Sequence, residues 1–133
     1  MAYNVLIVDD SRVTRAMVSK IVRMSGIELG EIYEAGNGRE GLEQLDANWI
    51  DIVFADINMP EMTGIEMVDR MSQSGVLATT PVIIISTERS VTRIEELKAK
   101  GASAYLKKPF TPENVKAVIE DMLGARSAGG ESG

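Results

Sequence analysis

Acidic, hydroxyl and basic side chains directly follow short apolar runs of the sequence. Asp9 and Asp10 follow the first run, and Asp56 follows the second. Ser86 follows a third run, and Lys108 lies two residues beyond a fourth. If these runs are strands of one parallel sheet, their carboxyl ends share one edge, which is where open α/β sheets bind ligands. We therefore expect these five side chains to meet in one cleft.

Three carboxylates in one cleft repel one another, and one lysine cannot neutralise them. At ~5 Å and an effective dielectric constant of ~20, each pair costs about 3 kcal/mol. The chain has no Cys and no His, so oxygen atoms would have to hold any metal. This favours a hard cation, and we expect Mg²⁺. A carboxylate nucleophile, a divalent cation, a lysine and a hydroxyl together suit phosphoryl transfer.

The runs themselves predict the strands that would position these side chains. Residues 5–8, 52–55 and 82–85 are nearly all apolar and rich in β-branched side chains, which is typical of strands buried on both faces of a parallel sheet. Residues 31–35 and 104–106 are weaker candidates. We expect these two strands nearer the edges of the sheet.

Amphipathic segments alternate with the strands and predict helices. The first helix should begin after Ser11 as N-cap, and the last should begin at Thr111 with Pro112 at its first position. The other three are expected over residues 38–45, 65–72 and 91–100. The apolar stripes predicted for the first and last helices consist of Val13, Met17, Val18, Ile21 and Val22, and of Val115, Val118, Ile119, Met122 and Leu123.

Five strands alternating with five helices predict an α/β fold, a doubly wound five-stranded parallel sheet. The chain has 133 residues, enough for one domain with one hydrophobic core. We place this domain at residues 1–124. The Gly- and Ser-rich residues 125–133 are expected to be a disordered tail.

The charge and the first residues exclude several kinds of partner. A net charge of −6 argues against nucleic acid, whose binding proteins need a basic face. No segment approaches a membrane span, and the N-terminus lacks the features of an export signal. We therefore expect a cytoplasmic protein that binds neither nucleic acid nor membranes. Without His the chain could only receive a phosphoryl group from a phosphohistidine, never carry one.

Taken together, four motifs resemble the receiver domain of bacterial response regulators, and among these the stand-alone, chemotaxis-type CheY-like proteins. Each motif is weak by itself, but they stand in the family's order from about Tyr3 to Leu123. The resemblance implies the strand order 2-1-3-4-5. The motifs are Val8-Asp9-Asp10-Ser11, Asp56-Ile57-Asn58-Met59-Pro60 with Gly64, Ile85-Ser86, and Lys107-Lys108-Pro109-Phe110.

The resemblance also implies the phosphorylation and metal sites. Asp56 would become the aspartyl phosphate. Asp10 and Asp56 would bind Mg²⁺ directly, Asn58 would contribute its backbone carbonyl, and Asp9 would act mostly through water. The Asn58 side chain also occupies a position that tunes the rate of phosphate loss in this family.

Further roles follow from the same resemblance. Lys108 would be the counter-charge of the phosphoryl group, and the Ser86 hydroxyl would move to donate a hydrogen bond to it. Tyr105 stands where the family has an aromatic residue that turns inward during the switch. Thr87 is bulkier than the residue often found there, and Glu88 occupies a second rate-tuning position.

The implied function is a phosphorylation-controlled binding switch with weak self-catalysed phosphorylation and dephosphorylation, not a turnover enzyme. Its partners would be a sensor histidine kinase or phosphotransfer protein and an unidentified downstream protein. The latter would bind the face formed by residues 91–100, the strand at 104–106 and the last helix. We expect a monomer, and chemotaxis is one pathway it could serve.

Other functions fit the residues less well. A Mg²⁺-dependent phosphatase with an Asp nucleophile usually needs an acid two residues later, where this chain has Asn58. A flavodoxin-like FMN site would place Asp9 and Asp10 beside the phosphate of FMN, and the two carboxylates would repel it.

Each site residue also has a simpler explanation. Asp9 and Asp10 could merely cap a helix, and Asp56 could be a solvated loop acid. Ser86 could be an ordinary strand-end hydroxyl, and Lys108 could be a surface lysine beside Lys107. Tyr105 is as well explained by covering an edge strand as by switching.

Overall fold

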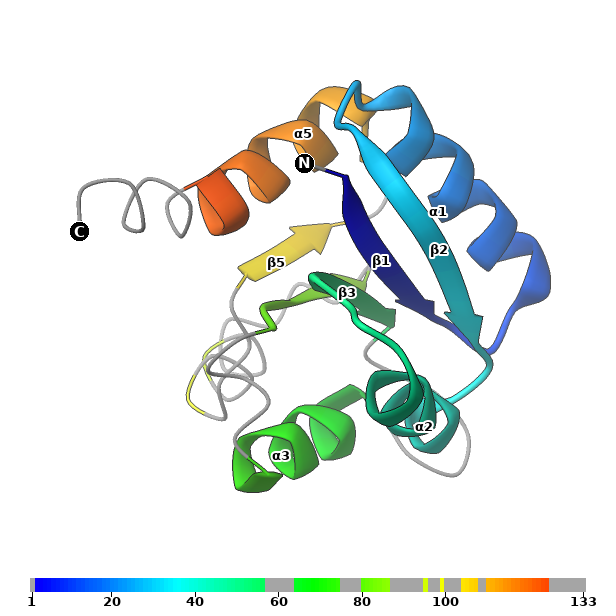
Figure 1. Ribbon diagram of the computed structural model, residues 1–133, viewed down its shortest axis with the longest axis vertical. Coiled ribbons are helices and arrows are strands. Elements are labelled where there is room, and N and C mark those ends of the chain that lie inside the picture. Colours follow the sequence, from blue (N-terminus) through cyan, green and yellow to red (C-terminus); the bar gives the residue numbers. More distant parts are fainter. Residues whose placement is uncertain are drawn as a thin grey trace.

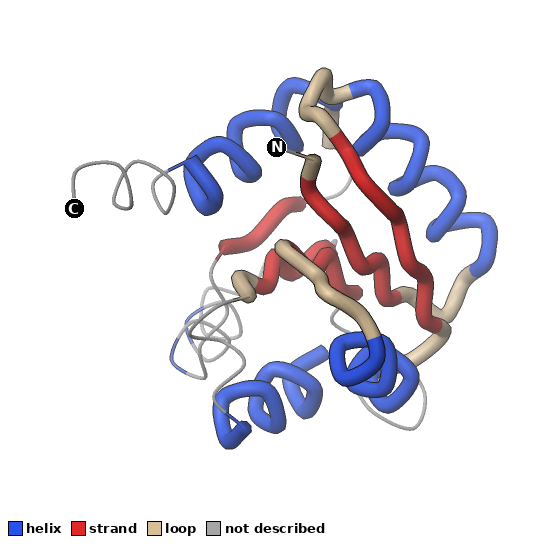
Figure 2. Tube along the Cα trace, viewed as in Figure 1, coloured by secondary structure: helices blue, strands red, loops and turns tan. Residues whose placement is uncertain are grey.

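Five parallel strands form a single sheet in the order β2-β1-β3-β4-β5, as predicted. The computed structural model describes residues 2–56, 64–74, 80–86, 95, 99, 104–107 and 110–124. Figure 2 shows the strands in the middle of the molecule with helices on both sides. Every strand includes its predicted run and is only a residue or two longer. The strands are β1 (Tyr3–Val8), β2 (Leu29–Ala35), β3 (Ile52–Asp56), β4 (Val82–Ser86) and β5 (Ala104–Lys107).

Four of the predicted helices lie within the described residues. The predicted helix over residues 91–100 lies outside them, except for Glu95 and Ala99, which are both helical. None of the described helices is long and apolar enough to cross a bilayer. The helices are α1 (Arg12–Met24), α2 (Gly38–Ala47), α3 (Gly64–Ser74) and α5 (Pro112–Ile119), which continues into a π-helical turn, η2 (Glu120–Gly124).

The predicted helix starts are confirmed. The Ser11 hydroxyl accepts a hydrogen bond from the backbone N–H of Thr14, 3.2 Å away, and so caps α1. Thr111 caps α5 in a reciprocal arrangement with Asn114, and Pro112 occupies the first turn. Such caps satisfy backbone donors that the helix itself leaves without partners.

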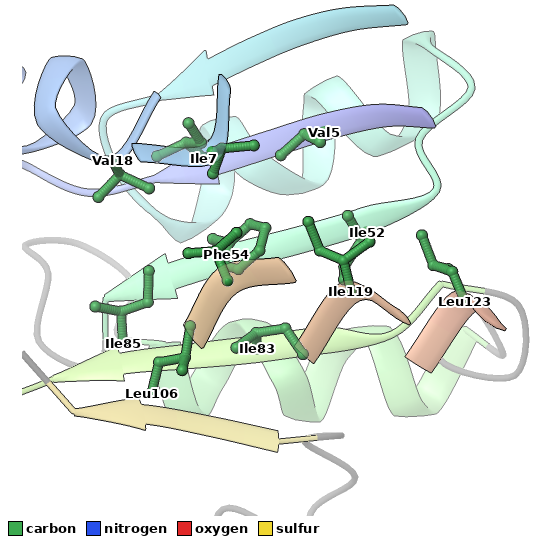
Figure 3. Packing of buried hydrophobic residues seen from close by; sticks show 12 residues of the cluster. Val5, Ile7, Val18, Ile52, Phe54, Ile83, Ile85, Leu106, Ile119 and Leu123 are labelled. Atoms are coloured by element: carbon green, nitrogen blue, oxygen red, sulfur yellow. The ribbon is translucent and has the colours of Figure 1, made fainter. Parts of the chain in front are cut away.

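Two apolar layers, one on each face of the sheet, bury the strands. Helices α1 and α5 cover one face and α2 and α3 cover the other (Figure 1). Because successive side chains of a strand point to opposite faces, Ile52 and Phe54 of β3 join the α1/α5 layer, and Val53 and Ala55 join the other. Figure 3 shows the first layer, with Ile119 packed near Phe54 and Ile52. Both faces of the central strands are therefore fully buried, as their unbroken apolar runs predicted.

The apolar stripe predicted for α1 is only partly correct. Val18 and Val22 are buried, but Val13 is 77% exposed and Met17 is 54% exposed. At about 100° per residue, positions 13 and 22 lie on opposite sides of the helix. The five apolar positions therefore span too wide an arc for all of them to face the sheet. Only the side of α1 that carries Val18 and Val22 faces it.

This difference predicts unequal effects for two identical substitutions in α1. Val22→Ala should lower the free energy of unfolding by about 2 kcal/mol, because it removes two buried methyl groups and leaves a cavity. Val13→Ala should change it by no more than about 0.5 kcal/mol, as is usual at exposed positions. Urea denaturation measures both, and the gain in helix propensity is the same in each. Equal losses would contradict the described orientation of α1.

Candidate functional site

The strand ends that carry the predicted site residues lie side by side. Val8 of β1 pairs with Ala55 of β3, so Asp9 and Asp56 stand at the same level of the sheet. Asp56, the last residue of β3, in turn pairs with Ile85, next to Ser86 at the end of β4. Parallel strands bring residues separated by about half the chain to one edge in this way.

Three carboxylates meet at this edge. Asp9, Asp10 and Asp56 each offer a carboxylate oxygen, and these three atoms all lie within 4.8 Å of one another. Asp9 is 4% exposed, Asp56 is half-buried and Asp10 is exposed. The exposure of the three carboxylates therefore increases from Asp9 through Asp56 to Asp10, and the site is open to solvent on the side of Asp10.

The donor set suits a hard divalent cation. Asp9 and Asp56 repel each other by about 3 kcal/mol at this separation if the effective dielectric constant is ~20, and a bound cation would reverse that cost. Oxygen ligands of Mg²⁺ lie about 3 Å apart when adjacent and about 4.2 Å apart when opposite, and the three oxygens here lie within 4.8 Å of one another. Small rotations of these side chains would let one or two carboxylates bind Mg²⁺ directly and the third bind it through a water molecule. Mg²⁺ prefers such sites, in which it keeps several of its waters.

The turn between β1 and α1 holds Asp9 firmly. Its backbone N–H donates to the carbonyl of Ala35 in β2 at 3.0 Å. Its Oδ1 accepts a hydrogen bond from the backbone N–H of Ser11 at 2.8 Å. Because Ser11 is itself the N-cap of α1, capping alone does not explain why two acids precede it.

No pattern in the sequence singled out Arg15, yet it contacts the same turn. Its Nη1 donates to the backbone carbonyl of Asp9 at 2.7 Å. Its Nε lies 3.0 Å from Oε1 of Glu34, near the end of β2. The sequence shows only that a basic residue follows Asp10 within the first turn of a predicted helix. Such a spacing is too common to predict a role for Arg15.

The remaining predicted residues are placed only in part. Tyr105 lies on β5 opposite Ile84, half-buried against the layer under α2 and α3. That position is compatible with both covering an edge strand and switching. Ser86 ends β4. The other four, which lie outside the described residues, are Asn58, Thr87, Glu88 and Lys108.

Comparisons with known proteins show the family to which the chain belongs. The family model described as the response regulator receiver domain matches residues 5–120. The chain is 34% identical over 120 residues to the chemotaxis protein CheY1 of Helicobacter pylori, covering 90% of this chain and 95% of that protein. It is 37% identical over 122 residues to the two-component response regulator ORR3 of Oryza sativa subsp. indica, covering 90% of each.

A solved structure shows the same fold. The chemotaxis protein CheY4 of Vibrio cholerae superposes with a TM-score of 0.80 at 35% sequence identity, over 92% of this chain and 99% of that one. The family match lies inside the predicted domain at residues 1–124, whose exact limits stay a prediction. The chain belongs to the response regulator receiver family and is a CheY-like receiver of two-component signalling.

Proposed function

We propose that Asp56 accepts a phosphoryl group from the phosphohistidine of a partner protein and that phosphorylation changes which proteins this chain binds. The observation that carries the proposal is the meeting of three carboxylates at one sheet edge, with Asp56 among them. A signalling switch is the general role of the family.

The surroundings of the three acids favour Asp56 as the nucleophile. Asp9 is almost fully buried and already accepts a hydrogen bond from the Ser11 N–H. Asp56 ends a strand that is paired on both sides, with β1 and with β4, so its backbone position is fixed. A nucleophile held rigidly by a sheet needs little reorganisation before attack.

The proposed reaction needs a carboxylate and no acid or base from this chain in the first step. An oxygen of Asp56 attacks phosphorus, the P–N bond breaks, and its electron pair stays on the donor's imidazole, which carries a proton on its other ring nitrogen and so leaves as a neutral ring. The product is an acyl phosphate. Water later attacks phosphorus, and cleavage of the P–O bond releases inorganic phosphate and restores the carboxylate of Asp56.

Other residues would assist these steps. Asp9, Asp10 and Asp56, with the backbone carbonyl of Asn58, would hold Mg²⁺, which when bound would neutralise charge on the phosphoryl oxygens. Lys108 would add a second positive charge, and Ser86 would hydrogen-bond the attached phosphoryl group. Asn58, Thr87 and Glu88 would set the rate of its loss. The roles of the residues from Asn58 to Lys108 rest on their family resemblance.

The proposed partners are a histidine kinase or phosphotransfer protein upstream and an unidentified protein downstream. Contacts of Ser86 and Lys108 with the phosphoryl group would draw the loops after β4 and β5 toward it and shift an existing equilibrium of the neighbouring face. Tyr105 of β5 would take part in that shift. We place the protein in the cytoplasm as a monomer, and chemotaxis is one pathway in which it could act, since a relative named above is a chemotaxis protein.

The direct test is to find the phosphorylated atom in the native chain. After treatment with acetyl phosphate and Mg²⁺, reduction with borohydride converts an aspartyl phosphate to homoserine, which peptide mass spectrometry locates. We expect homoserine at position 56 only. Modification at another acid, or none in a folded protein, would overturn the proposal.

A further inference from the structure

Arg15 links three parts of the chain beside the acidic site. It projects from the first turn of α1, donates to the Asp9 carbonyl at 2.7 Å and pairs with Glu34 of β2 at 3.0 Å. Its side chain is 18% exposed, and that of Glu34 is 47% exposed. We propose that Arg15 is a positioning residue that sets the direction of the Asp10 carboxylate, and that Glu34 orients Arg15. This rests on the proposed Mg²⁺ site.

The planarity of the peptide bond explains how Arg15 acts at a distance. The carbonyl of Asp9 and the backbone N–H of Asp10 belong to one rigid plane. Fixing the carbonyl oxygen therefore fixes the plane from which the Cα of Asp10 and its side chain extend. The backbone N–H of Asp9 is held independently by Ala35, so together Arg15 and Ala35 fix both peptide planes that flank Asp9.

The alternative explanation, that Arg15 serves only to hold α1 against β2, is weaker. An ion pair with a partner as exposed as Glu34 contributes little stability, typically about 0–1 kcal/mol. The hydrogen bond from the guanidinium to the Asp9 carbonyl, at 2.7 Å, lies at the short end of the N–H···O range and is charge-assisted. Its acceptor is the peptide carbonyl that joins Asp9 to Asp10, where a small rotation matters for metal binding and little for packing.

The sign of the electrostatic effect separates the two explanations. Arg15 is a cation close to a proposed cation site, so its charge by itself opposes Mg²⁺ binding. Removing that charge should make binding tighter if Arg15 does nothing but hold the helix. Removing it should make binding weaker if Arg15 positions Asp10.

The experiment is a titration with Mg²⁺ alone, followed by isothermal calorimetry at fixed ionic strength. We expect Arg15→Met to weaken Mg²⁺ binding about tenfold, the lower end of the range for residues that orient metal ligands. Arg15→Lys keeps the charge and can still reach one acceptor, so its loss should be smaller. Arg23→Met is the matched control, because Arg23 is exposed in the last turn of the same helix. It should bind Mg²⁺ as tightly as the native chain.

Each outcome of the titration supports or overturns the positioning role of Arg15 or the proposed metal site. Unchanged or tighter binding by Arg15→Met, or an equal loss in Arg23→Met, would overturn the positioning role. If Arg15→Met does not fold, Arg15→Gln, which also lacks the guanidinium charge, takes its place: weaker binding supports the role, and unchanged or tighter binding overturns it. A native chain that binds no Mg²⁺ would instead count against the proposed metal site, so the two failures are distinguishable.

Discussion

An Asp56→Asn variant should take up no phosphoryl group from acetyl phosphate, whereas the native chain should gain one per molecule. Asn has the same shape as Asp but lacks the anionic oxygen that attacks phosphorus. Strand β3 is paired with β1 up to Ala55 and with β4 through Asp56, so the substitution should leave the fold intact. Intact-mass analysis with Mg²⁺ present measures the uptake, and hydroxylamine should remove the group from the native chain.

Asp46→Asn is the matched control, since it makes the same chemical change on the exposed surface of α2. It should be phosphorylated like the native chain. Circular dichroism should show all three proteins equally folded. A phosphoryl group on Asp56→Asn that hydroxylamine removes would mean that another acid of the cluster, such as Asp10, is the nucleophile.

The strands and their order were the most predictable part of the fold. A strand buried on both faces needs apolar side chains at every position, so the run Ile52-Val53-Phe54-Ala55 stands out without any knowledge of its partners. The acid after it then falls at the sheet edge by topology alone. This is why the meeting of Asp9, Asp10 and Asp56 could be predicted from a chain in which they are widely separated.

The exposed face of α1 could not be predicted in the same way. Val13 and Val22 are the same residue type, but one is 77% exposed and the other is buried. Which part of a wide apolar arc faces the sheet depends on how the helix is rotated and on where α5 packs beside it. Neither is encoded in the spacing along α1.

The contact of Arg15 with the β1–α1 turn could not be predicted from the sequence either. It joins residues 15, 9 and 34 through a backbone carbonyl and a long side chain, and no periodicity marks such a contact. Hydrogen bonds from side chains to the backbone depend on local geometry, not on the type of the residue that offers the carbonyl. Only the folded chain reveals them.

Asp10→Asn should change stability in opposite directions with and without Mg²⁺. Without the ion, the free energy of unfolding should rise by about 1 kcal/mol, because one of three like charges is removed and water screens much of the repulsion at this exposed residue. Mg²⁺ binding should weaken about 100-fold or more, since losing even an outer partner of a metal ligand costs 10–100-fold.

The order of stability should therefore reverse as Mg²⁺ is added. At a concentration 100 times its dissociation constant, the ion should stabilise the native chain by about 2.7 kcal/mol, but the variant by only about 0.4 kcal/mol. Urea denaturation in EDTA and in Mg²⁺ at constant ionic strength measures both values, and Asp46→Asn should show no reversal. General damage to the fold lowers stability under both conditions and cannot produce a reversal. If the variant were less stable in EDTA as well, Asp10 would be a structural residue and the cluster would not be a site built for a cation.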